Sequence, residues 1–218
     1  MAKKVLLRLR LATEIDMLGA DPPLVNGPDG PRAMNIGDLL SIVIPTCPVG
    51  GVEVWQKVAL KRAFDGAKEV EGKKKRMSLP IATKTKAPND RPTSLRTVGG
   101  LIVSIIPSCA SRDDLNAARL WRIGGDISEA DGETFTLTKP DFDALKSAMG
   151  VERESEDAER LSDIADDIKD SKKPTIDLPS LDFDLLRKRC KEGNRPTWVV
   201  INLNQAFDAA KEVGKDDK

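Results

Sequence analysis

Side chains that usually carry out catalysis are scarce in this sequence, and histidine is absent from all 218 residues. Histidine is the commonest general base and metal ligand, so its absence excludes imidazole triads and histidine-containing zinc sites. Neither phosphate-binding loop, GxxxxGK followed by Ser or Thr or GxGxxG, occurs in the chain. We therefore expect a protein that is not an enzyme and that holds no metal and no cofactor.

Three cysteines, Cys47, Cys109 and Cys190, are the remaining candidates for reactive chemistry. Their odd number and their lack of paired spacing favour a reducing compartment, the cytoplasm. Without histidine, a reactive thiolate needs a helix N-terminus or nearby cations. Only Cys190 has such cations beside it in the sequence, namely Arg187, Lys188, Arg189 and Lys191. Because free cysteine is among the most buried residue types, we interpret all three as packing residues.

Basic and acidic side chains balance at 35 each, but they are segregated along the chain. Residues 72–97 contain Asp90 as their single acidic residue, whereas residues 126–184 hold 18 acidic and seven basic ones. Such blocks usually mark solvated surface or interaction faces. The basic residues of the first block are Lys73, Lys74, Lys75, Arg76, Lys84, Lys86, Arg91 and Arg96.

The basic block has two interpretations. One is an arm that follows nucleic-acid phosphates, where each neutralised phosphate steepens the salt dependence of binding. The other is a solvated loop that lies against the acidic block of the same chain. The block offers no aromatic side chain for base stacking, and Pro80, Pro88 and Pro92 argue against a recognition helix. Nucleic-acid binding through residues 73–96 is therefore kept as the alternative function.

An internal repeat at an offset of 62 residues relates residues 36–47 to residues 98–109. Gly, Leu, Ile, Pro and Cys recur in register, and an amphipathic helical pattern follows each copy. We expect residues 36–67 and 98–127 to form similar helix pairs, with Gly124 and Gly125 ending the second. Trp55 and Trp121 lie on the apolar faces of these patterns, which predicts that both belong to the core.

A second repeat, at an offset of 41 residues, relates residues 137–146 to residues 178–187. Each copy predicts a short extended entry, a polar cap at Thr138 or Ser180, and a helix with two aspartates in its first turn. Carboxylates in that position complement the helix dipole. The structural role explains the aspartates, so we do not assign a paired-carboxylate site to them.

The elements that position these residues predict a mainly α fold with a few short β-strands (α+β). Alternating leucines and arginines over residues 5–11 predict a half-exposed strand. The repeats predict two related helical halves from an internal duplication, with one copy inside the other. The predicted parts are a first half with the strand at 1–72, an exposed basic linker at 73–94, a second half at 95–150, and an acidic helix with a C-terminal helical unit at 151–218.

The order of these motifs resembles that of short phage- and prophage-encoded accessory proteins. In that type, a strand and a glycine turn precede an Ile/Leu-Gly-Asp-Leu-Leu helix, a basic amphipathic helix, a Leu-Ser/Thr-x-x-Asp helix and a Val-Val-rich helix. The matching stretches are 27–30, 36–40, 55–64, 178–186 and 198–207. The resemblance covers about half of the chain and implies a phage accessory or virion role, with no catalytic residues.

From these patterns we expect a non-catalytic interaction protein that acts through protein–protein contacts, as a virion component or as a host-directed inhibitor. The expected partner is a phage or host protein or a second copy of the chain. Trp198 is the candidate partner anchor, with a core position as its other interpretation. No run of eighteen apolar residues occurs, so we expect no membrane association. The expected location is the bacterial host cytoplasm or the virion.

Overall fold

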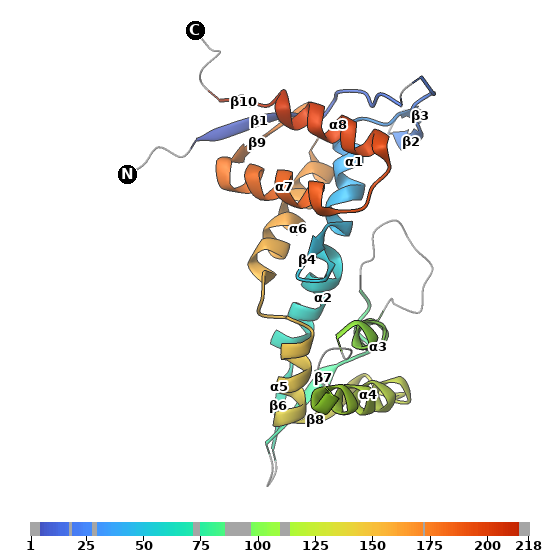
Figure 1. Cartoon of the computed structure of the whole chain (residues 1–218), viewed down its shortest axis with the longest axis vertical. Helices are drawn as coiled ribbons and strands as arrows, with labels where there is room; N and C mark the ends of the chain where they lie inside the picture. The colour runs from blue at the N-terminus through green and yellow to red at the C-terminus, as the bar shows by residue number, and fades with distance from the viewer. Residues whose placement is uncertain are drawn as a thin grey trace. The chain divides into compact units, whose positions relative to one another are not determined.

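The structure is a computed structural model that describes residues 5–17, 19–27, 30–71, 75–85, 97–109, 114–171 and 173–213. Its helices and short antiparallel strands confirm the predicted mainly α class with a few β-strands (Figure 1). The chain forms two compact units. The first unit contains the chain up to residue 48 and from residue 159 onward, and the second contains residues 49–158.

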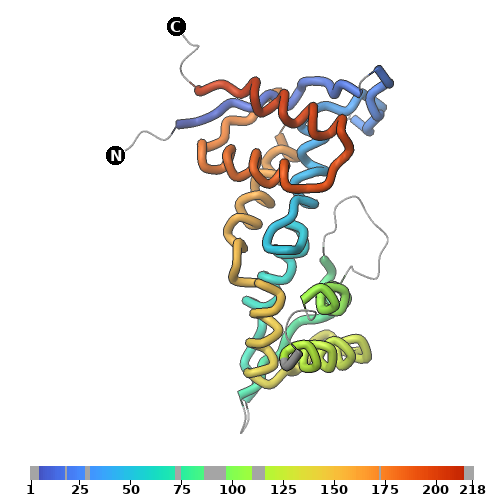
Figure 2. Tube along the Cα trace, in the orientation of Figure 1, coloured from blue at the N-terminus to red at the C-terminus, as the bar shows by residue number. Residues whose placement is uncertain are grey.

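The first unit is built around a small antiparallel sheet in the order β10-β1-β9. Strand β1 is the predicted N-terminal strand, and it pairs with β9 so that Leu7 lies opposite Leu178. Leu9 of β1 is fully buried, whereas Arg8 forms an exposed cross-strand ion pair with Asp177. In Figure 2 the N-terminal strand and the C-terminal helices lie side by side, although they come from opposite ends of the chain. The elements of this unit are β1 (Leu6–Arg10), β2 (Leu24–Gly27), β3 (Gly30–Ala33), α1 (Ile36–Val43), the 3-10 helix η1 (Ile44–Thr46), β9 (Thr175–Pro179), α7 (Ser180–Glu192), α8 (Thr197–Asp208) and β10 (Lys211–Glu212).

The second unit has its own antiparallel sheet, in the order β6-β7-β8, with helices packed on it. Leu79 of the central strand is fully buried and lies opposite Phe135. The elements of this unit are β5 (Val52–Glu53), α2 (Val54–Asp65), β6 (Lys68–Val70), β7 (Arg76–Pro80), α3 (Val98–Cys109), α4 (Asp114–Ser128), β8 (Thr134–Thr138) and α5 (Lys139–Ala148). Two further elements, β4 (Pro48–Val49) and α6 (Ser155–Asp170), contain the boundaries between the units.

The two units repeat the same backbone contacts. In the first, Gly37 N donates to Leu11 O at 2.9 Å, and in the second, Gly99 N donates to Ile81 O at 2.9 Å. Each glycine permits this close approach, because a Cβ would lie 3.3 Å from Leu11 Cβ or 3.2 Å from Ile81 Cβ. The other matched contacts are Leu11 N to Pro174 O with Ile81 N to Glu133 O, Ser180 N to Val5 O with Lys139 N to Lys75 O, and the ring pairs Phe183–Phe207 and Phe64–Phe142.

These contacts show which elements of the two units are equivalent. Among the strands, β1 corresponds to β7, β9 to β8 and β10 to β6; among the helices, α1 corresponds to α3, α7 to α5 and α8 to α2. The counterpart of α2 is therefore α8, not α4 as the pairing of residues 36–67 with 98–127 predicted. The sequence agrees, because residues 63–70 repeat as residues 206–213 with one substitution, Gly66 for Ala209. Descent of both units from one duplicated ancestor stays a prediction.

The predicted parts differ from the observed units. Helix α2 and strand β6 were placed in the first half at 1–72, but they belong to the second unit. The predicted linker at 73–94 contains β7, the central strand of the second sheet. The physical reason is the alternation of Met77, Leu79 and Ile81, which puts three apolar side chains on one face of the strand and into the core.

Three local predictions also need correction. Helix α4 does not end at Gly124 and continues to Ser128. Gly124 instead permits close packing, because a Cβ there would lie 2.8 Å from Ile106 Cδ1 on α3. Thr138 caps α5 as predicted, but the cap of α7 is Pro179, and Ser180 is its first helical residue. Trp121 is 55% exposed rather than part of the core.

Candidate functional site

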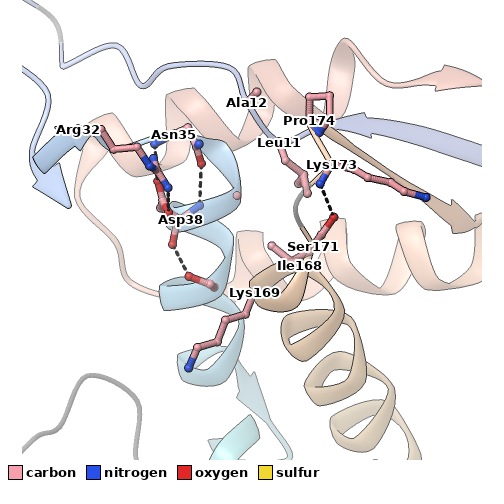
Figure 3. A pocket seen from close by; sticks show the side chains of 12 residues that line it. Leu11, Ala12, Arg32, Asn35, Asp38, Ile168, Lys169, Ser171, Lys173 and Pro174 are labelled. Carbon is pink, nitrogen blue, oxygen red and sulfur yellow. Dashed lines mark hydrogen bonds and ion pairs between the residues drawn. The ribbon is translucent and has the colours of Figure 1, made fainter. Parts of the chain in front are cut away.

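A pocket of about 370 Å³ opens beside the start of α1 in the first unit (Figure 3). Helix N-termini bind anions when their backbone amides are free. Here the first amides are already bonded, because Ile36 N donates to Thr13 O and Gly37 N donates to Leu11 O. The third amide, of Asp38, donates to the side chain of Asn35, which is the helix cap. The helix start is therefore closed to an anion.

The charged groups of this pocket are also engaged or diverge. Arg32 donates two hydrogen bonds to the Asp38 carboxylate, at 2.6 and 2.8 Å. Lys169 and Lys173 line the pocket as exposed side chains, and in Figure 3 they extend in different directions. No pair of these cations converges on one point. We therefore interpret the pocket as a structural gap beside the capped start of α1 and not as a binding site.

Lys57 is a fully buried lysine in the second unit, on the apolar face of α2 between Val54 and Val58. Its Nζ donates to Gly150 O at 2.7 Å, beyond the end of α5. Burial lowers the pKa of Lys57, although the Glu154 carboxylate opposes the shift. A lysine of this kind resembles a catalytic amine, but its Nζ points at a backbone carbonyl and has no exposed surface. We therefore assign it to holding the turn after α5.

Two ion pairs explain the first aspartate in each copy of the second repeat, Asp141 and Asp182. Arg119 on α4 donates to Asp141 at the start of α5, and Arg160 on α6 donates to Asp182 at the start of α7. Thr138 and Arg122 also contact the Asp141 carboxylate. Each aspartate thus joins two helices. Within the described residues, no cluster of three or more Cys, Asp or Glu side chains could hold a metal ion.

Two of the three cysteines meet in the first unit. Cys47 Sγ, just after η1, lies 3.9 Å from Cys190 Sγ in the last turn of α7. Both side chains are buried, and Arg195 Nη2 lies 3.4 Å from Cys47 Sγ. Cys109 lies in the second unit and is partly exposed. Sequence neighbours were a poor guide here, because Arg187 pairs with Asp208 and Arg189 pairs with Glu192, whereas the cation beside Cys47 is Arg195.

The protein environment shifts the thiol pKa values in opposite directions. The hydrogen bond between the Cys47 and Cys190 thiols, and after it the positive charge of Arg195, lower the pKa of Cys47 against the effect of burial. The same contact with Cys47, together with burial, raises the pKa of Cys190. Burial raises the pKa of Cys109. Cys47 is consequently the thiol best placed to ionise.

The predicted basic contacts are only partly placed by the structure. Lys75 and Arg76 are exposed where β7 begins, and Lys84 is exposed beyond its end. The others, Lys73, Lys74, Lys86, Arg91 and Arg96, lie outside the described residues. The described part of the predicted patch therefore consists of three residues: Lys75 and Arg76, which are adjacent in the sequence, and Lys84, which follows the strand.

The tryptophans occupy three different environments. Trp55 is partly buried and packs against the core of the second unit. Trp198, the predicted anchor, is also half-buried, in the first turn of α8. Trp121 is the most exposed of the three, at 55%. Sequence periodicity placed Trp121 on an apolar face, but the apolar face of α4 that reaches the core carries Leu120, Ile123 and Ile127.

Comparisons with protein-family models, with curated proteins and with solved structures found no match for this chain. Among the residues that the structure describes, every helix is too short or too polar to cross a lipid bilayer.

Proposed function

We propose that this protein is a non-catalytic interaction protein that acts through protein–protein contacts, in the manner of the phage accessory proteins whose motifs it resembles. Its role is that of a virion component or a host-directed accessory protein. The observation that carries the proposal is the exposure of Trp121 on α4. Tryptophan and arginine are the residues most enriched among those that dominate binding energy at protein interfaces.

The surface around Trp121 suits such a contact. Ala118 lies three positions before Trp121 and Gly125 lies four positions after it, so both share its helix face. Arg122 is the next residue in the sequence, and all three residues are exposed. We call these four residues the Trp121 face. Gly125 has open space where a Cβ would be, so the helix surface at this position is not covered by a neighbouring side chain. A flat aromatic surface beside small residues and a cation can be buried by a partner at little conformational cost.

The same position is not apolar in the first unit. Arg119 on α4 and Arg160 on α6 form equivalent ion pairs, so the two helices correspond between the units. In this correspondence Ser162 is the residue equivalent to Trp121. The fold therefore does not require a tryptophan here. An exposed indole that the fold does not need supports a role in binding.

A photo-crosslinking residue at position 125 tests the proposal, in cells of the natural host, with the chain carrying either Trp121 or Trp121→Ser. We expect a discrete protein adduct with Trp121 and a clear loss of it with Trp121→Ser. Thermal unfolding of both chains should stay nearly equal, because an exposed side chain contributes little to the core. A crosslinker at Lys188, an exposed residue of α7, is the control position. Equal adducts with Trp121 and Trp121→Ser would refute the proposal.

Nucleic-acid binding by the basic segment 73–96 is the second candidate. The observation in its favour is that Lys75 and Arg76 stand where the matched strand of the first unit has Val5 and Leu6, so the fold does not demand basic residues. A gel shift at two salt concentrations tests it. Binding that weakens with salt and with Lys75→Gln plus Arg76→Gln would support this function over the first.

A further inference from the structure

The thiol pair of the first unit combines two features that no packing role requires. The two sulfur atoms, Cys47 Sγ and Cys190 Sγ, lie 3.9 Å apart, and a guanidinium nitrogen of Arg195 lies 3.4 Å from Cys47 Sγ. In the second unit the matched positions are Cys109 and Met149, so a dithiol is not part of the shared fold. This difference singles out the first unit for thiol chemistry.

The fold holds Cys47 and Cys190 together from two distant parts of the chain. The turn of η1 is closed by a hydrogen bond from Cys47 N to Ile44 O at 3.0 Å, which fixes the backbone at the first thiol. Helix α7 packs against η1 and carries the second thiol in its last turn. A disulfide needs its sulfur atoms at about 2.05 Å, so the two sulfur atoms must approach by roughly 2 Å.

Arg195 is organised around Cys47 rather than around a carboxylate. Its Nη1 donates to Thr46 Oγ1 at 3.1 Å, and its Nη2 also donates to Val43 O at 3.2 Å. Its Nε is buried and has no hydrogen-bond acceptor. A positive charge at this distance favours the thiolate form of Cys47, and an unused donor beside it is available to an oxygen added to the sulfur.

We propose that Cys47 and Cys190 form an oxidative modification site, at which hydrogen peroxide converts the two thiols into an intramolecular disulfide. The Cys47 thiolate attacks one peroxide oxygen, the O–O bond breaks, and hydroxide leaves, so that Cys47 becomes a sulfenic acid. The Cys190 sulfur then attacks Cys47 Sγ, the S–O bond breaks, and the oxygen leaves as water with the Cys190 proton. In total, two thiols and one peroxide give one disulfide and two waters.

The disulfide would join the two chain segments from which the first unit is assembled. These segments are separated in the sequence by the whole of the second unit. A crosslink between residues that far apart removes much of the freedom of the unfolded chain, so oxidation should stabilise the first unit. A dithiol reductant restores the two thiols and reverses the effect.

The test uses the full-length chain with Cys109→Ser, which leaves only the two thiols of the site. The folded protein is treated with hydrogen peroxide, then unfolded and alkylated, and digested for mass spectrometry. We expect a peptide that links Cys47 to Cys190, a monomeric protein, and a thermal midpoint that rises on oxidation and returns with dithiothreitol. Unchanged free thiols, or crosslinking between chains, would overturn the proposal.

Two further variants separate the proposed site from simple proximity. Cys190→Met copies the matched residue of the second unit, and with it Cys47 should proceed to sulfinic acid because no resolving thiol is present. Arg195→Gln should slow disulfide formation several-fold while circular dichroism shows the fold intact. An unchanged rate with Arg195→Gln would remove the arginine from the site. Disulfide formation in unfolded protein alone would show that the native geometry has no role.

Discussion

Arg119 on α4 and Asp141 on α5 form a hydrogen-bonded ion pair, with the arginine Nε 2.5 Å from a carboxylate oxygen. Arg160 and Asp182 form the matched pair in the first unit, at the same separation of 22 residues in the sequence. Both carboxylates lie in the first turn of a helix and receive a guanidinium from the helix that precedes the intervening strand. The pairs fix how the repeated helix–strand–helix segment packs in each unit.

Asp141→Asn should lower the free energy of unfolding by about 1–3 kcal/mol, because it removes charge-assisted hydrogen bonds from two arginines. Asp182→Asn is the matched variant and should cost less, since its side chain is 24% exposed compared with 12% for Asp141. Urea unfolding at neutral pH measures both. An equal or larger loss with Asp182→Asn would contradict the ranking.

The stabilising effect of Asp141 should also depend on pH. Burial acts to raise its pKa, but hydrogen bonds from Arg119, Thr138 and Arg122 together lower it below the usual 3.8. The folded state therefore holds this proton less tightly than the unfolded chain does. The stability difference between the natural chain and Asp141→Asn should be full above pH 3.8 and should shrink as the pH falls through the lowered pKa.

Gly124 and Gly125 are adjacent in α4 but should respond in opposite ways to alanine. Gly125→Ala should stabilise the protein by about 0.5–1 kcal/mol, because the position is exposed and helical and a Cβ meets open space. Gly124→Ala should destabilise it, because the new Cβ would press on Ile106, whose side chain is 1% exposed. Thermal unfolding of the two single variants gives the comparison. Equal gains would show that α3 and α4 do not pack closely at Gly124.

Lys57 should make the free energy of unfolding depend on pH in the alkaline range. Burial lowers its pKa in the folded state below the usual 10.5, so between those two values the unfolded chain binds more protons. The free energy of unfolding should then rise with pH across that window, relative to Lys57→Met, which does not titrate. Urea unfolding of both chains over alkaline pH measures the difference. A difference that stays constant with pH would mean that Lys57 titrates normally in the fold.

Substitutions in the middle of β7 and at its start should differ sharply in their effect on folding stability. Leu79→Ala should cost about 2–5 kcal/mol of folding stability, because Leu79 is fully buried in the core of the second unit. Lys75→Gln with Arg76→Gln should change stability by less than about 1 kcal/mol, since both residues are exposed. Guanidinium unfolding of the two variants distinguishes a core strand from an exposed linker. A small effect of Leu79→Ala would restore the linker interpretation.

Short-range patterns in the sequence were enough for the elements whose structure depends on neighbouring residues. The alternation of leucine and arginine predicted β1, and the polar residue before the aspartates predicted the cap at Thr138. The same patterns could not show that residues 76–80 form a central strand, because the strands on either side of it lie in other parts of the sequence. The repeat of residues 63–70 at 206–213, with one substitution, was present in the sequence and would have matched α2 with α8.

The sequence by itself determined the helical class, the first strand, the positions of the helices around the aspartates, and the absence of histidine chemistry. Only the tertiary structure decided that Cys47 meets Cys190, that Arg195 rather than a sequence neighbour faces a thiol, and that Trp121 is exposed. The physical reason is the range of the interactions. Helix caps and strand alternation act over a few residues, whereas burial and the pairing of thiols and charges depend on residues that are distant along the chain and close only after folding.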